Sequence, residues 1–324
     1  MLALIGRRLA VAVPLVLLAS FLCFVLVASS GDPLEALRIN PRTPVAVINK
    51  RASELHLDRP VVLRYGWWLR DAVHGDLGND NNGNSVSAQL SRALPVTLRL
   101  VLVAEILAVL VGVVLGVLSA VKQYSWFDFA TTTFSFVAFA LPVFWLAAVF
   151  KDVGIRINRA VGHRLFFTVQ QQSPGIQGST WHRFADALGH LVLPALTLVV
   201  VNIATYSRFQ RASMLDVQTA DYVRTARGKG LSEGRVTRRH AMRNALIPVT
   251  TLVALDFGQL LGGAVLTERV FQWKGMGTLL VTAVSKRDVN LMQAWLVVIA
   301  ITVVVFNLVA DIMYGVLDPR TRRG

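Results

Sequence analysis

The stretch TADYVRTARGKGLSEGRVTRRHAMRNALIP, residues 219–248, decides how this chain is interpreted. It is polar and strongly basic, and it lies between two long apolar segments. A basic stretch in that position is expected to lie in water on one side of a membrane. We therefore expect a partner to bind it there.

The stretch predicts two short helices. Thr219 is expected to cap the first, with Asp221 near its positive end, and Gly228 and Gly230 are expected to end it. Ser232 is expected to cap the second helix, which carries several arginines before the next apolar run.

One face of the first helix is small and apolar. Ala220, Val223 and Ala226 recur at helical spacing, and Arg224 and Arg227 lie beside them. We expect this face to dock on the partner.

The stretch resembles the cytoplasmic coupling loop of permease subunits of bacterial ABC importers. That loop follows a pattern of Glu-Ala-Ala, three residues, Gly, nine residues and Ile-x-Leu-Pro. Here Gly230 matches the glycine and Ala226 the second alanine, whereas Arg224 and Thr225 replace the first two residues. Residues 240–243 stand where Ile-x-Leu-Pro would be.

The departures themselves resemble one branch of these permeases. YVRTARGKGL at 222–231 and RHAMRNALIP at 239–248 are similar to the peptide/nickel branch, most of all to oligopeptide and dipeptide permeases. In that branch the first helix of the loop sits in a cleft of an ATP-hydrolysing partner. The resemblance therefore implies the coupling residues Tyr222, Val223, Arg224, Thr225, Ala226, Arg227, Lys229, Gly230 and Leu231.

Composition indicates an integral membrane protein. The chain has 324 residues, 54% of them hydrophobic, with apolar runs of membrane-spanning length. Its net charge is +14, but the basic residues flank apolar runs and no nucleic-acid motif accompanies them, so anionic lipid is the expected partner rather than nucleic acid. The single cysteine, Cys23, permits no disulfide within the chain.

Six membrane spans are predicted, at residues 9–28, 96–121, 128–150, 190–209, 248–267 and 294–316. A cleaved signal peptide is the alternative for the first, but its apolar run of about 20 residues suits a span better than a signal core of about 7–15. The N-terminal arginines, the basic stretch and the basic tail favour both termini inside, whereas the basic residues of the loop after the fifth span argue against it. The resemblance to the permease family implies that both termini are inside. The predicted organisation is an N-terminal helix at 1–28, an extracytoplasmic segment at 29–95, a transmembrane core at 96–316 with its coupling loop at 210–247, and a cytoplasmic tail at 317–324.

Several other phrases resemble the same family. They are GDP at 31–33, LDRPVVLRYGWWLRDAVHGDLG at 57–78, ERVFQWKGMG at 268–277 and DPR at 318–320. The resemblance implies an all-α, type I ABC importer permease fold with an extended extracytoplasmic segment after the first helix. Trp67, Trp68, Trp181 and Trp273 are expected to anchor the chain at the membrane interface, and 151–189 is expected to be a second outer loop.

The chain has no visible catalytic machinery. Gly228-Lys229-Gly230 is no phosphate-binding loop, since the upstream glycine and the following Ser or Thr are missing, and no HExxH, CxxC or GxSxG occurs. We expect no enzyme activity, cofactor or metal in this chain. ATP and Mg are expected on partner subunits.

A few polar residues fall inside the predicted spans. Asp256 and Gln259 share a face of the fifth span, where an ionisable group is costly. They either line a path for a charged, backbone-rich substrate or pair with a neighbouring subunit. Asn202 is a further path candidate, while Glu105 and Asn307 are expected to form hydrogen bonds between helices.

These observations predict a permease subunit of a bacterial ABC importer for peptides, most of all oligopeptides, in the plasma membrane. The implied partners are a homologous second permease, two ATP-binding subunits or one fused pair, and an extracytoplasmic substrate-binding protein. The same machinery importing dipeptides, nickel or another small solute is the alternative. A stand-alone secondary transporter would need inverted repeats and broken ion-binding helices, which the sequence does not display.

Overall fold

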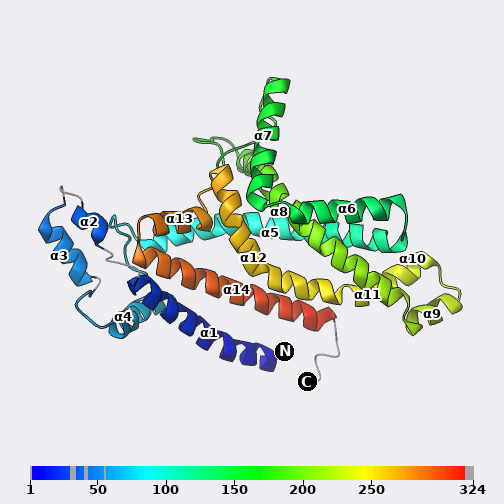
Figure 1. The fold of residues 1–324 in the computed structure, drawn as a ribbon, viewed down its shortest axis with the longest axis horizontal. Helices are drawn as coiled ribbons and strands as arrows, with labels where there is room; N and C mark the ends of the chain where they lie inside the picture. Colours follow the sequence, from blue (N-terminus) through cyan, green and yellow to red (C-terminus); the bar gives the residue numbers. More distant parts are fainter. Residues whose placement is uncertain (1, 30–33, 40–42, 55, 318–324) are drawn as a thin grey trace. The chain divides into compact units, whose positions relative to one another are not determined.

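The computed structural model describes residues 2–29, 34–39, 43–54 and 56–317 (Figure 1). Within these ranges the chain is helical, and Asn79 and Ser85 form an isolated β-bridge. The elements are α1 (Leu2–Ser29), α2 (Glu35–Ile39), α3 (Val45–Glu54), α4 (Val61–Val73), α5 (Val86–Val121), α6 (Trp126–Ala140), α7 (Val143–Val161), α8 (Thr180–Gln218), α9 (Asp221–Gly228), α10 (Glu233–Arg235), the π-helix η1 (Val236–Ala241), α11 (Met242–Ala245), α12 (Ile247–Phe271), α13 (Met276–Ser285) and α14 (Val289–Leu317).

Four helices in the described part of the chain are long and apolar enough to cross a membrane, namely α1, α5, α8 and α14. The pair α6 and α7 gives a fifth candidate if it forms one bent span. The helix α12, with 25 residues, lies where the fifth span is predicted. The all-helical membrane architecture is confirmed, and the count of six stays a prediction.

The predicted third span, 128–150, is broken at Pro142. α6 ends at Ala140, α7 resumes at Val143, and the two axes differ by 105°. Leu141 is extended, with ψ of 129°, because the ring of the following proline disfavours helical backbone there. Figure 1 shows α7 leaving α6 steeply.

By its contacts the chain divides into two compact units. The first comprises residues 1–95 and 278–305, and the second comprises 96–277 and 306–324. GDP at 31–33 and DPR at 318–320 lie outside the described residues.

In the first unit, the phrase at 57–78 forms the helix α4. Its Tyr65 hydroxyl lies 2.6 Å from the Ser20 hydroxyl of α1. The amide of Gln293, at the start of α14, donates to the Ser20 carbonyl over 2.8 Å. These hydrogen bonds hold α4 and the start of α14 against α1.

In the second unit, Gly112 and Gly116, four residues apart on one face of α5, bring α5 and α8 together. A Cβ added at Gly112 would lie 2.7 Å from the Tyr206 Cβ, and one at Gly116 would lie 2.6 Å from the Gln210 Cβ. Only glycine permits this approach, because Cβ atoms essentially never come that close.

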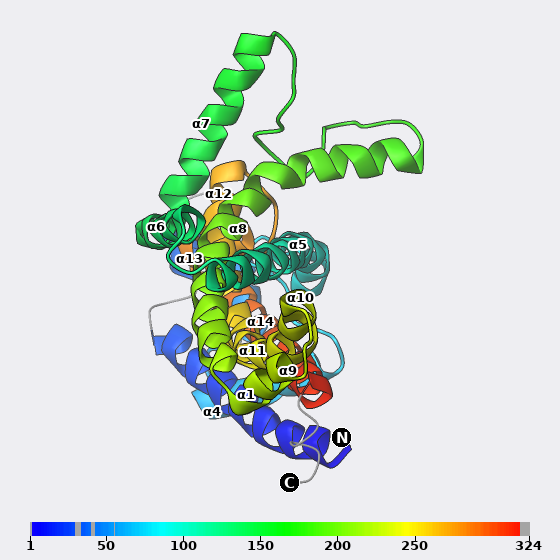
Figure 2. The same ribbon diagram turned by 90° about the vertical axis from the view of Figure 1, so that its right-hand side faces the viewer.

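The predicted loop at 151–189 is mostly helical, and its outer position stays a prediction. α7 continues to Val161, where Gly162 ends it with φ of +76°, and α8 begins at Thr180 after Ser179 caps it. The non-helical part is therefore only 162–179, visible at the top of Figure 2. His190 is 1% exposed and holds this connection through Nδ1, 3.0 Å from the Val169 carbonyl.

Candidate functional site

The basic stretch forms α9 followed by a compact helical segment, and its caps differ from those expected. The Thr219 hydroxyl donates to Asp216 at the end of α8, and α9 begins after Ala220 with no side-chain cap. The end of the helix is as predicted, because α9 ends at Gly228 and Gly230 follows with φ of +78°.

The apolar face of α9 turns toward the chain's own core, so the expected docking face is wrong. Val223 is 0% exposed and Ala226 is 5% exposed. They pack with Met214 of α8, Ala120 of α5 and Val236 of η1 in one hydrophobic cluster. Small apolar side chains gain more from this packing than from facing water, so the face is used within the subunit.

The surface that α9 leaves exposed is polar. It is made of Asp221, Tyr222, Arg224, Thr225, Arg227 and Lys229. Arg227 donates to the Glu233 carboxylate over 2.9 Å, whereas the Arg224 side chain is 70% exposed. The Asn244 amide donates to the Tyr222 hydroxyl over 2.8 Å and ties α9 to α11.

The predicted second helix is divided into α10, η1 and α11. Ser232 stands before α10, but its side chain makes no cap hydrogen bond. In η1 the buried residues are Val236 and Ala241, and basic side chains occupy its last turn. A π-helix is often found at functional sites.

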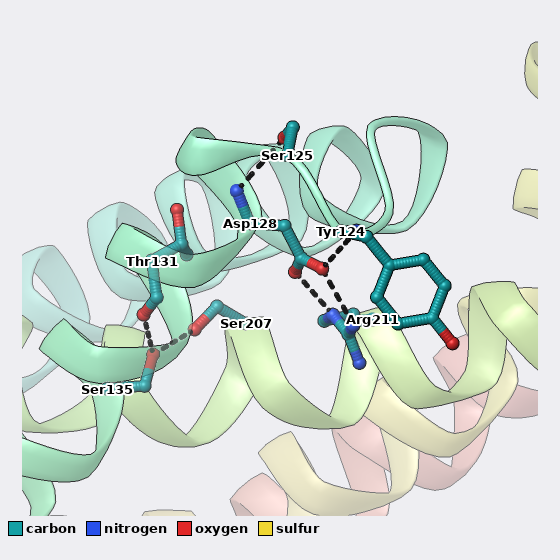
Figure 3. Close-up of polar contacts among 7 residues, drawn as sticks. All are labelled: Tyr124, Ser125, Asp128, Thr131, Ser135, Ser207 and Arg211. Carbon is teal, nitrogen blue, oxygen red and sulfur yellow. Dashed lines mark hydrogen bonds and ion pairs between the residues drawn. The ribbon is translucent and has the colours of Figure 1, made fainter.

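An ion pair ties the start of α6 to α8, just before the coupling stretch (Figure 3). Arg211 Nε lies 2.6 Å and Nη2 lies 2.8 Å from the two oxygens of Asp128. The Tyr124 N–H also donates to Asp128. Two turns further along α6, the Ser135 hydroxyl lies 3.0 Å from that of Ser207, one turn before Arg211 on α8. The sequence alone does not predict this pair, although Asp128 begins the predicted third span and Arg211 follows the end of the predicted fourth.

A second polar cluster joins α5, α8 and α12 at Tyr206, which is 0% exposed. Its hydroxyl donates to Glu105 over 2.5 Å and also reaches the Asp256 carboxyl. The expected hydrogen bond between helices is therefore confirmed for Glu105. The other oxygen of Glu105, Oε2, is buried without a hydrogen-bond partner among the described residues.

The remaining path candidates are less well placed. Asp256 and Asn202 are half-buried, on α12 and α8. The Gln259 side chain lies outside the described residues. Whether these groups face a path stays a prediction.

The phrase at 268–277 is buried in the protein, so the predicted interfacial position of Trp273 is wrong. Trp273 is 0% exposed. Glu268, also 0% exposed, accepts hydrogen bonds from the Thr97 hydroxyl and the Gly277 N–H. A Cβ added at Gly275 would overlap the Glu268 carboxyl, which explains the glycine there.

Comparisons with known proteins agree on one class. The family model described as "Binding-protein-dependent transport system inner membrane component" matches residues 112–323. The chain is 41% identical over 319 residues to the oligopeptide transport system permease protein OppB of Mycobacterium tuberculosis (strain ATCC 25618 / H37Rv), covering 98% of each. It is 37% identical to the oligopeptide permease AppB of Bacillus subtilis and 34% identical to the dipeptide permease DppB of Escherichia coli K12, covering 99% of each chain in both cases.

Among solved structures, the fold of this chain is similar to that of a chain in an ABC transporter. A chain of the MetNI methionine ABC transporter in an inward-facing conformation matches with a TM-score of 0.53 at 16% identity, over 71% of this chain and 96% of that one. At such low identity the match supports the fold alone.

Proposed function

Because this chain belongs to the family of binding-protein-dependent transport system inner membrane components, we propose that it is a permease subunit of an ABC importer for peptides, chiefly oligopeptides. The observation that carries the substrate class is the 41% identity to an oligopeptide permease across 98% of both chains. The B. subtilis relative, also named for oligopeptides, supports the same class.

In this proposal the chain forms the translocation path with a homologous second permease. Two ATP-binding subunits, or one fused pair, bind ATP and Mg on the cytoplasmic side, and a substrate-binding protein delivers the peptide outside. The chain crosses the plasma membrane several times with both termini in the cytoplasm.

Energy enters through the exposed surface of α9. Its inner residues, Val223 and Ala226, fix the helix to the ends of α5 and α8, so a push on α9 moves these helices with it. Its outer residues, among them Arg224 and Lys229, remain available to the ATPase. ATP binding closes the ATPase pair, and alternating access follows.

The path is proposed to run along the face of α12 that carries Asp256. This half-buried carboxyl, together with Glu105 and Tyr206, places acidic and hydroxyl groups at membrane depth. Ionisable groups there are costly and are usually kept for function. The half-buried Asp256 carboxylate would interact with the N-terminal ammonium group of a passing peptide, with Glu105 and Tyr206 packed behind it.

The test is ATP-driven uptake of labelled peptides of two to six residues in liposomes that contain the complete complex, comparing wild type with Gly230→Pro. Proline fixes φ near −65°, whereas Gly230 has φ of +78° and donates its N–H to Arg227 over 2.9 Å. Uptake should be lost while peptide binding to the complex persists. Normal uptake by the variant would refute the coupling role of this stretch.

The matched control is Gly234→Pro, just beyond Ser232, where an added Cβ meets nothing within 4 Å. The peptide series also tests the alternative of dipeptide transport, suggested by the E. coli relative. Preference for two residues over four to six would assign the chain to dipeptides.

A further inference from the structure

A cavity in the first unit is lined by aromatic and charged side chains and has no part in the transport mechanism proposed above. Its volume is about 120 Å³. Its walls include Phe24 of α1, a group on α4 and the residue Asp76 in the turn that follows α4. The α4 group is Arg64, Trp67, Trp68 and Asp71.

The side chains that line this cavity suit a ligand that carries one positive group and one negative group. Two carboxylates, from Asp71 and Asp76, and one guanidinium, from Arg64, give these three groups a net charge of −1. Tryptophan faces attract ammonium groups, and a guanidinium is a matched donor for phosphate oxygens. The buried indole N–H of Trp68 has no acceptor among the described residues, so it offers a second donor to an anionic group.

The cavity is held at a fixed depth along α1. The Tyr65 ring of α4 lies edge-on to Phe21 and Phe24, with centroids 5.2 and 5.7 Å apart, and its hydroxyl donates to the Leu17 carbonyl. Phe24 is five residues before the end of α1, which is about 7.5 Å along a helix axis.

That position is near the outer end of the predicted span of α1. Arg7 and Arg8 precede the apolar run, so the predicted span is residues 9–28, about as long as a hydrocarbon core of about 30 Å, and Phe24 lies about 6 Å from its outer end. α4 also exposes Val62, Leu63 and Val73, by 65%, 51% and 77%, as a helix lying in the interface would.

We propose that this cavity binds the headgroup of a zwitterionic aminophospholipid from the outer leaflet. Its ammonium group lies against Asp71 and the tryptophans, and its phosphate lies at Arg64. The cavity is far smaller than a small-molecule site of about 300–1,000 Å³ and holds about four water volumes, which fits a headgroup end but not a peptide. The proposal requires that α1 crosses the membrane in the orientation given above, and it does not depend on what the chain transports.

The test is native mass spectrometry of the full chain with the subunits that purify with it, titrated with phosphatidylethanolamine and, separately, with phosphatidylglycerol. The ethanolamine lipid should bind at least about tenfold more tightly, because an ammonium group near aromatic rings and a carboxylate gains roughly that factor. Asp71→Asn and Trp67→Leu should each remove this preference. The matched control is Asp58→Asn, which changes an exposed carboxylate outside the cavity.

Equal binding of the two lipids to wild type would overturn the proposal, and this comparison needs no variant to fold. Retention of the preference in Asp71→Asn at an unchanged melting temperature would overturn it as well. A third arm adds free dialanine, a zwitterion without lipid tails. Displacement of the lipid by millimolar dialanine would assign the cavity to a soluble zwitterion and refute the lipid.

Discussion

Arg211 binds the Asp128 carboxylate through two parallel hydrogen bonds, of 2.6 and 2.8 Å, and so connects the first turn of α6 to α8 (Figure 3). Asp128 is 4% exposed. Arg211 lies one turn before Met214, which packs under α9. A displacement of α9 therefore reaches the broken pair α6 and α7 through a rigid, charge-assisted contact.

The Asp128–Arg211 pair should be needed for both stability and coupling. Removing one partner of a buried ion pair costs about 3 kcal/mol, so Arg211→Ala should lower the melting temperature of the purified complex and abolish uptake. Arg211→Lys keeps the charge but loses the two-pronged contact, so its uptake should fall while the complex still assembles. A variant Arg211→Ala with wild-type melting and uptake would contradict this role.

Substitutions on the buried face and on the exposed face of α9 should affect different properties, namely folding of the subunit and binding of the ATPase. Val223→Asp places a charge in a fully buried site and should prevent assembly of the subunit. Arg224→Asp changes a side chain that is 70% exposed and should leave melting unchanged while weakening association with the ATPase about tenfold or more. Co-purification and thermal melting distinguish the two. If Arg224→Asp binds the ATPase normally, the exposed face is not the contact surface.

The close contact of α5 and α8 should not tolerate a methyl group. Gly116→Ala would place its Cβ 2.6 Å from atoms of Ser207 and Gln210, and such overpacking costs about 1–3 kcal/mol. Gly6→Ala on α1, where nothing lies within 4 Å, is the control and should be neutral or slightly stabilising. Equal melting temperatures for the two variants would mean that the helices are further apart.

Peptides with a blocked amino terminus should reveal whether Asp256 lines the path. If it does, Asp256→Asn should reduce uptake of a free peptide about tenfold more than uptake of its N-acetylated form, because only the first carries an ammonium group. If Asp256 instead pairs with a neighbouring subunit, both peptides should be affected equally and the complex should melt earlier. Tyr206→Phe, which leaves the Glu105 carboxyl without its donor, should cost about 1–3 kcal/mol in either case.

The loop at 78–85 should weaken in acid. Burial would raise the pKa of the Asp80 carboxyl, but hydrogen bonds from Asn84, Gln89 and Asn82 outweigh it and hold the pKa below its ordinary value of 3.8. A depressed pKa stabilises the fold above the unfolded value and loses this contribution as pH falls through the folded value. Between pH 5 and 3 the melting temperature of wild type should therefore fall more than that of Asp80→Asn. Asp58→Asn, an exposed acid, should behave as wild type.

The sequence predicts the features of this fold that depend on local patterns. Long apolar runs mark the helices, Pro142 marks the break between α6 and α7, and the spacing of Gly112 and Gly116 marks a close helix contact. Each follows from backbone geometry or from the length of an apolar segment, so no knowledge of distant neighbours is needed.

The features that depend on distant neighbours are missed. Periodicity shows that Val223 and Ala226 share a face, but it does not distinguish the chain's own core from a partner as the surface that covers it. The same holds for Trp273, whose amphipathic ring suits a membrane interface and a protein interior equally well. Asp128 and Arg211 are 83 residues apart, and only the packing of α6 on α8 brings them together.

The inward face of α9 has a consequence for how the transporter is built. Because Val223 and Ala226 are already covered by residues of the same subunit, the helix proposed as the coupling element is packed in place without an ATPase. Under the proposed function, docking of the ATPase would then order little of α9, so that the entropy cost of binding would be small. An ATPase subunit could then dissociate and be replaced by another copy while the permease stays folded.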